Sequence, residues 1–141
     1  MIKSIIDTGP LVALFAKDDK YHQPVINFFK NYNGQLYSTW PVLTEVCHLL
    51  SSNLKIQIDF IEWVSIGGLE IVELPSIKIN NILKISKKYI DIPMDLADAS
   101  LVIIAEELNI LSIITIDSDY DIYRIFNKQR FNNLLKEYIK K

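Results

Sequence analysis

The sequence predicts an α/β fold in which helices cover both faces of a parallel sheet. Short apolar runs alternate along the chain with longer segments whose apolar residues recur three and four positions apart. Such runs are typical of strands buried on both faces of a parallel sheet and joined by helical crossovers. Half of the 141 residues are apolar and 23% are charged, so the chain can bury a core, and we expect one domain over residues 1–141.

The first part of the chain predicts two strands and two helices. The first strand is expected over residues 2–6, which lead directly to an acid, Asp7. A helix begins there, because Asp7 or Thr8 can cap it and a proline stands in its first turn. A second helix is expected over residues 24–32 and ends at an Asn-Gly turn signal. A brief strand over residues 36–38 follows.

The middle of the chain predicts three helices and one strand. Thr39 can cap a helix whose apolar stripe covers residues 42–50. Residues 56–66 form another helix, which a pair of glycines ends. Residues 69–74 are apolar and β-branched enough for a strand, and a proline separates them from a helical pattern over residues 77–89.

The last part of the chain predicts a buried helix, a strand and a terminal helix. Asp95 can cap a helix over residues 96–105 that is apolar nearly all the way round, so we expect it to be deeply buried. Residues 110–116 form a β-branched strand that again ends on an acid, Asp117. Residues 131–139 have the pattern of an amphipathic helix.

The net charge of −2 is unevenly distributed: residues 122–141 carry +5 and residues 1–121 carry −7. The basic end is either a solvated terminal helix or a rim that contacts phosphates. The apolar stretches fall short of the roughly 18 residues that span a bilayer, so we expect no membrane partner. The start of the chain lacks the apolar region of a signal peptide, and a single cysteine, Cys47, allows no internal disulfide. We therefore expect a cytoplasmic protein.

Four acids are expected to meet at one edge of the sheet. Asp7 follows the first strand and Asp117 the last, and the carboxyl ends of parallel strands border the ligand crevice. Asp98 lies one turn into the buried helix, and Glu45 lies at the edge of an apolar stripe. Neighbouring carboxylates lose hydration and repel one another unless they bind protons or a cation. With oxygen ligands alone, Mg²⁺ or Mn²⁺ is favoured.

Taken singly, each acid also has a simpler interpretation. Asp7 and Asp95 can be helix caps, and for Asp95 a cap is favoured over a metal ligand. Glu45 can be a solvated residue at the edge of its helix, and Asp117 can form a turn. The prediction of a metal site therefore depends on the convergence of the acids rather than on any one of them.

Four segments resemble the PIN domain family, and within it the small VapC-type toxins of prokaryotic toxin–antitoxin pairs. They are IIDTGPLVALF, STWPVLTEVCHLL, MDLADASLVIIAEEL and ITIDSDYDIYR, and the resemblance covers nearly the whole chain. It implies a three-layer α/β/α fold with a central parallel sheet of four to five strands. It also implies an endoribonuclease that hydrolyses RNA phosphodiester bonds with Mg²⁺ or Mn²⁺.

Carried over by position, the resemblance places the catalytic quartet on Asp7, Glu45, Asp98 and Asp117. Asp7 and Asp98 would be the principal metal ligands. Glu45 and Asp117 would complete the metal shell directly or through water.

Four further positions follow from the same resemblance. Thr8 and Thr115, beside the first and last acids, would support the ligands or face the substrate. Asp95 matches an acid often found one turn before the third ligand, which makes it a secondary candidate. The chain departs from the common pattern at Tyr120, where phenylalanine is usual.

The resemblance further implies partners: an RNA substrate, a cognate antitoxin that enters the groove of the active site, and a second copy in a homodimer held partly by the third and fourth helices. Two alternatives stay open. One is a PIN-type nuclease that processes RNA or recognises nucleic-acid structure without being a toxin. The other is a PIN module that binds RNA or protein and does not catalyse a reaction.

Overall fold

A computed structural model describes residues 1–139 of the chain. Its strands, helices and 3₁₀ turns (η) follow in the order β1 (Ile2–Ile6), α1 (Thr8–Phe15), α2 (His22–Asn31), β2 (Gly34–Ser38), α3 (Trp40–Leu49), α4 (Leu54–Ser65), β3 (Glu70–Ile71), η1 (Ser76–Lys78), α5 (Ile79–Lys88), α6 (Leu96–Leu108), β4 (Ser112–Ile114), η2 (Ser118–Asp121), β5 (Arg124–Ile125), β6 (Gln129–Arg130), β7 (Asn132–Asn133) and α7 (Lys136–Ile139).

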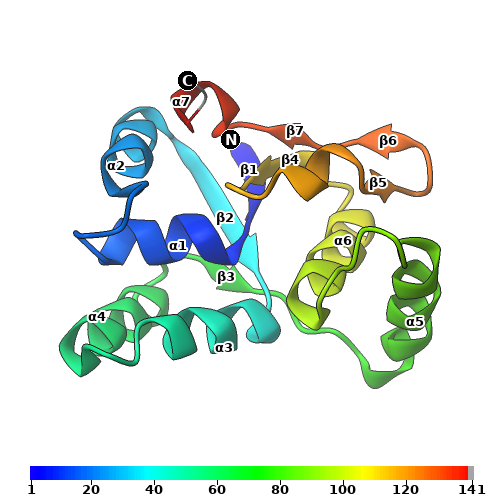
Figure 1. Ribbon diagram of the computed structural model, residues 1–141, viewed down its shortest axis with the longest axis horizontal. Helices are drawn as coiled ribbons and strands as arrows, with labels where there is room; N and C mark the ends of the chain where they lie inside the picture. The colour runs from blue at the N-terminus through cyan, green and yellow to red at the C-terminus, as the bar shows by residue number, and fades with distance from the viewer. Residues whose placement is uncertain (140–141) are drawn as a thin grey trace.

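The central sheet has five strands in the order β3-β2-β1-β4-β7, and all neighbours are parallel. In β1, Ile5 pairs with Tyr37 of β2 on one side and with Ile113 of β4 on the other. Helices α1 and α2 lie to the left of the sheet and α5 and α6 to the right (Figure 1). The predicted three-layer α/β/α fold, with a parallel sheet of four to five strands, is confirmed.

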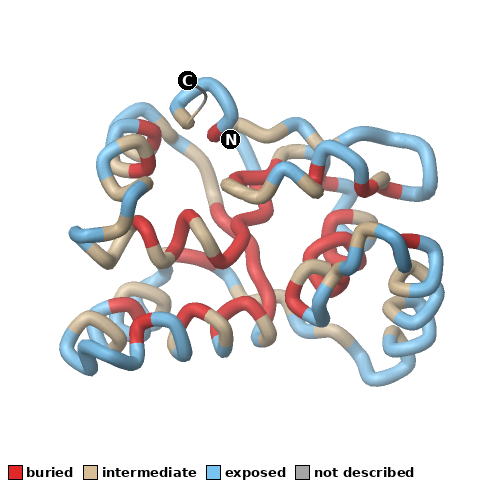
Figure 2. The backbone as a smooth tube through the Cα atoms, in the orientation of Figure 1, coloured by how far each residue is buried: buried red, intermediate tan, exposed pale blue. Residues whose placement is uncertain are grey.

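Helix α6 is the most buried helix of the fold, as its apolar sequence predicts. Every residue from Ala97 to Ala105 except Asp98 is buried. The helix packs against both α3 and α5. Figure 2 shows the buried backbone concentrated in α6, α1 and the adjoining strands, whereas α5 faces solvent on its outer side. Asp98 is thus a carboxylate held at the start of a core element.

Two predicted strands are shorter than expected, because the neighbouring strand of the sheet ends before they do. The segment predicted as a strand over residues 69–74 pairs only at Glu70 and Ile71, since β2 ends at Ser38 opposite Ile71. The segment over residues 110–116 is a strand only over Ser112–Ile114, and it stops there because β1 ends at Ile6 opposite Ile114. A strand needs a partner for its backbone hydrogen bonds, which its own composition does not supply.

The prediction of a helix over residues 131–139 is wrong for its first half. Asn132 and Asn133 form β7, which covers the free edge of β4. The Asn132 amide donates to the Leu111 carbonyl and the Leu134 amide to the Ile113 carbonyl, both at 2.9 Å. Only Lys136–Ile139 are helical. The sheet edge therefore determines the conformation of this segment, against its periodicity.

A small hairpin that the sequence did not predict precedes β7. Its strands β5 and β6 pair antiparallel, and Phe126 and Asn127 turn the chain with φ of 54° and 61°. The basic segment expected over residues 122–141 thus forms the hairpin, β7 and α7 rather than one helix. Its last two lysines lie outside the described residues. No helix in the described part of the chain is long and apolar enough to cross a membrane.

Candidate metal centre

Three acids from distant parts of the sequence meet at the carboxyl ends of two neighbouring strands. Asp7, Asp98 and Asp117 each present a carboxylate oxygen, and these oxygens lie within 4.8 Å of one another. Asp7 follows β1 directly, and its amide donates to the Ile114 carbonyl at 3.1 Å, which extends the pairing of β1 with β4. Parallel pairing therefore brings the ends of both strands together, and the first turn of α6 adds the third acid.

Asp7 is buried and is not a side-chain helix cap. It occupies the N-cap position of α1, yet its carboxylate makes no capping hydrogen bond and is only 6% exposed. Burial raises the pKa of Asp7 to about 6; the Thr8 amide and the Thr115 hydroxyl lower it, and the charges of Asp117 and Glu45 raise it. The Thr115 hydroxyl donates to Asp7 Oδ2 at 2.9 Å. Asp7 is therefore the N-cap residue of α1 by position, as predicted, but its carboxylate is directed to Thr115 and the acid group rather than used as a side-chain cap.

Asp98 is hydrogen-bonded at both carboxylate oxygens. The Asp95 amide donates to Asp98 Oδ2 at 3.2 Å, and the Asp98 amide donates to Asp95 Oδ1 at 2.8 Å, which forms a capping box. The Tyr120 hydroxyl donates to Asp98 Oδ1 at 3.1 Å. Burial and then the charges of Asp7 and Asp95 raise the pKa of Asp98 to about 7. The interpretation of Asp95 as a cap is confirmed, and Asp95 stands outside the three-acid group.

Glu45 lies beside the three acids without belonging to their group. It projects half-buried from α3, and the Thr8 hydroxyl donates to Glu45 Oε1 at 2.7 Å. Thr8 follows Asp7 in the chain, so this bond holds Glu45 next to the first acid, where its charge raises the pKa of Asp7. The structure thus brings Glu45 to the border of the site.

Asp117 and Thr115 form a hydrogen-bonded turn at the end of β4. Asp117 Oδ1 accepts from the Asp119 amide at 2.9 Å, so Asp117 is both a turn former and a member of the acid group. The Thr115 hydroxyl donates to Asp7 and accepts from the Asp117 amide at 3.0 Å, so one buried hydroxyl links both acids. Thr115 thus links two members of the acid group, as its predicted place beside the last acid allows.

Two residues that position the site were missed by sequence reasoning. The Asn133 carboxamide bonds both backbone groups of Thr115, accepting from its amide at 3.3 Å and donating to its carbonyl at 3.0 Å. Nothing in the sequence indicates this, because the segment has the pattern of a helix. Tyr120 did carry a signal, since the resemblance expects phenylalanine there. Its hydroxyl is the group that reaches Asp98.

The three acids have no basic partner within residues 1–139. The ion pairs found there join Lys55 to Asp59, Lys78 to Glu107 and Lys136 to Asp121, all outside the acid group. The raised pKa values of Asp7 and Asp98, next to a third carboxylate and without a compensating cation in the described residues, fit a hard divalent ion, which prefers oxygen ligands. The donor set contains carboxylates alone, so it fits Mg²⁺ or Mn²⁺ better than Zn²⁺.

Beside the acid group lies an exposed apolar area, called here the Trp40 surface. Its large apolar side chains, each at least half exposed, are Trp40, Ile61, Ile79 and Leu96. They line three hollows of about 260, 540 and 550 Å³ that meet at Trp40. The last hollow is also lined by Glu45 and Asp95, so it extends from the Trp40 surface to the border of the acid group.

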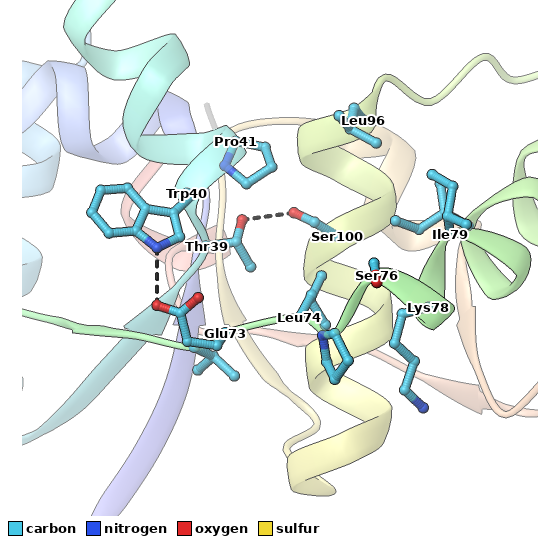
Figure 3. Close-up of a pocket in the computed structure, with 13 residues that line it drawn as sticks. Thr39, Trp40, Pro41, Glu73, Leu74, Ser76, Lys78, Ile79, Leu96 and Ser100 are labelled. Atoms are coloured by element: carbon cyan, nitrogen blue, oxygen red, sulfur yellow. Dashed lines mark hydrogen bonds between the residues drawn. The ribbon is translucent and has the colours of Figure 1, made fainter.

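Figure 3 shows the smallest of these hollows. Trp40 and Glu73 lie on one side, Ile79 lies on the other, and Ser100 of α6 lies between them. The Trp40 indole donates to Glu73 Oε2 at 3.1 Å, which fixes the ring while its faces stay open. The hydroxyls of Thr39, the N-cap residue of α3, and of Ser100 in α6 are hydrogen-bonded at 2.6 Å, and both residues line the hollow.

Fold and site together define an α/β protein with an acidic centre suited to a divalent cation at the carboxyl edge of its sheet. The sequence model of the PIN domain matches residues 4–125, and the chain belongs to the PIN domain family. The fold is similar to that of VapC20 of Mycobacterium tuberculosis, described as a toxin that cleaves the sarcin–ricin loop. The TM-score is 0.74 at 14% identity, over 82% of this chain and 90% of that one. No curated protein matches the sequence.

Proposed function

We propose that this single PIN domain is a Mg²⁺- or Mn²⁺-dependent endoribonuclease and the toxin of a toxin–antitoxin pair. The observation that carries the proposal is the convergence of Asp7, Asp98 and Asp117 within 4.8 Å, with no cation partner in the described part of the chain. Membership of the PIN domain family and the likeness of the fold to a toxin support it.

In this proposal the acids hold the cation and the hydroxyls around them hold the acids. Asp7 and Asp98 are the principal ligands, and Glu45 and Asp117 complete the shell directly or through water. When bound, the cation neutralises the phosphate and makes water more acidic. Thr115 holds Asp7 through its Oδ2 atom in the orientation that binds the cation. The uncompensated acids repel RNA, so substrate binding requires the metal.

The Trp40 surface supports the proposed protein partners. Large exposed apolar areas on soluble proteins mark interaction sites, and this one is hollowed around a fixed indole. We place on it the contact between two copies in a homodimer, with the cognate antitoxin entering through the hollow shared with Glu45. With RNA as its substrate and an antitoxin as its partner, the protein is proposed to act in the cytoplasm.

The test is cleavage of a mixed RNA pool by the purified protein in Mg²⁺, in EDTA, and by the Asp98→Asn variant in Mg²⁺. We expect cleavage in the first sample alone, because the variant keeps the shape of Asp98 and removes its charge. Cleavage by the variant at the wild-type rate would refute the assignment of Asp98. Equal cleavage in EDTA would refute metal dependence.

A growth test separates the toxin from the two alternatives. Expression of the wild-type chain should arrest growth, and Asp98→Asn should not. Metal-dependent cleavage without growth arrest would indicate an RNA-processing or structure-specific nuclease. Binding of RNA without cleavage would indicate a non-catalytic module.

A further inference from the structure

Two buried tyrosines follow Asp117 within six residues, and their hydroxyls have different partners. Tyr120 is 1% exposed and donates to the carboxylate of Asp98 at 3.1 Å. Tyr123 is 0% exposed and donates to the carbonyls of Ile92 and Pro93 at 3.3 Å. The two rings pack edge to face with centroids 5.2 Å apart. The pair therefore offers a comparison of two buried tyrosines, each packed edge to face against two aromatic rings, whose hydroxyls have different partners.

The contact from Tyr120 completes the immobilisation of Asp98. One oxygen of this carboxylate accepts from the Asp95 amide at the start of α6, and the other accepts from Tyr120 in η2. Two donors on different elements prevent the carboxylate from rotating, and each oxygen keeps a lone pair for another ligand. Because η2 begins directly after Asp117, the same short segment positions two of the three acids.

The ring of Tyr120 and its hydroxyl serve different purposes. The ring packs edge to face against Tyr123 and Phe131, and a phenyl group would fill the same space. The hydroxyl adds the bond to Asp98. A buried phenol needs a hydrogen-bond partner, but a backbone carbonyl would satisfy it, as Ile92 and Pro93 satisfy Tyr123.

We propose that Tyr120 is a positioning residue of the metal centre, whose hydroxyl holds the Asp98 carboxylate in the orientation that binds a divalent cation. This inference rests on the proposed function, because it takes Asp98 as a metal ligand. Donors that orient metal ligands commonly change metal affinity by 10- to 100-fold when they are removed. Here one oxygen of Asp98 stays bonded to Asp95, so we expect a loss at the lower end of that range.

The test is titration with Mn²⁺ alone, followed by calorimetry, of the wild-type chain and of the variants Tyr120→Phe and Tyr123→Phe. Each variant removes one hydroxyl from a buried ring. Tyr120→Phe should weaken Mn²⁺ binding by about tenfold, and Tyr123→Phe should leave it unchanged. Thermal unfolding in EDTA confirms that both variants fold.

Cleavage kinetics give a second readout. The Mg²⁺ concentration for half-maximal cleavage should rise by about tenfold in Tyr120→Phe. The kcat should approach the wild-type value at saturating Mg²⁺, because the ligands themselves are intact. In an Asp98→Ala background, Tyr120→Phe should have no further effect on Mn²⁺ binding, since the side chain that the hydroxyl positions is gone.

Three results would overturn the inference, and one of them concerns the proposed function. Wild-type affinity in Tyr120→Phe would show that the hydroxyl does not position a ligand. An equal loss in both variants would show a general effect of removing a buried hydroxyl. If the wild-type chain binds no Mn²⁺, the proposed function itself fails, and the role of Tyr120 fails with it.

Discussion

The acid group and the Trp40 surface are neighbours, since a hollow at Trp40 reaches Glu45 at the border of the acid group, but they are built in opposite ways. Each of the three acids is held by a hydrogen-bond donor from the protein: the Thr115 hydroxyl for Asp7, the Tyr120 hydroxyl for Asp98 and the Asp119 amide for Asp117. The Trp40 surface presents open apolar faces, and its indole makes a single hydrogen bond, to Glu73. The first is suited to one small, hard ligand, whereas the second is suited to area contact with a large partner.

The largest expected effect comes from the acid group. Asp7→Asn should reduce RNA cleavage by at least about 100-fold, the scale seen when one electrostatic group of an active site is lost. Without metal, the variant should be no less stable than the wild type at pH 8, because the change removes a buried charge and keeps a carbonyl for the Thr115 hydroxyl. Cleavage rate and thermal unfolding in EDTA measure the two effects. A variant that unfolds easily at pH 8 would show that Asp7 stabilises the fold.

The second prediction concerns pH. The folded protein holds Asp7 and Asp98 with pKa values of about 6 and about 7, above the usual 3.8. It therefore binds more protons than the unfolded chain between pH 4 and 7, and these groups make stability fall as pH rises through that range. A divalent cation needs both acids ionised, so Mg²⁺ should stabilise the protein at pH 8 and have little effect at pH 5.

Calorimetric unfolding at pH 5 and pH 8, in EDTA and in Mg²⁺, measures this effect. At a Mg²⁺ concentration 100 times its Kd, the gain at pH 8 should be about 2.7 kcal/mol. Asp98→Asn serves as the control, since it should reduce both the pH dependence in EDTA and the gain from Mg²⁺. A Mg²⁺ effect that is equal at both pH values would contradict the assignment of these two acids.

The smallest effect is expected at the Trp40 surface. Trp40→Ala should weaken the homodimer by about 2 kcal/mol, roughly 30-fold, as for a central aromatic residue of an interface. It should leave Mn²⁺ affinity unchanged. Sedimentation equilibrium gives the dimer constant, and the control is Ile90→Ala, a side chain that is 72% exposed, lies outside α3 and α4 and lines none of the three hollows. Equal dimer constants for both variants would place the interface elsewhere.

The convergence of Asp7 and Asp117 could be predicted because parallel strands end at the same edge of a sheet. Asp98 could be predicted as a member of the site because it stands at the start of an otherwise apolar helix, where a carboxylate is costly unless a cation or a proton compensates its charge. Glu45 was expected as a fourth member, yet it lies at the border, held by Thr8. Its distance from the others depends on how α3 packs against α1 and α6, which helical periodicity does not determine.

The sequence by itself determined the α/β class, the order of most elements and the acids at the strand ends, because periodicity, caps and strand-terminal residues act locally. Only the tertiary structure decided the form of residues 124–139. There the open edge of β4 pairs with Asn132 and Asn133 as a strand and brings the Asn133 side chain to Thr115. The hydrogen bond from Tyr120 to Asp98 likewise joins residues that only the tertiary fold brings together. Both depend on groups more than 15 residues apart, and local pattern carries no information about such pairings.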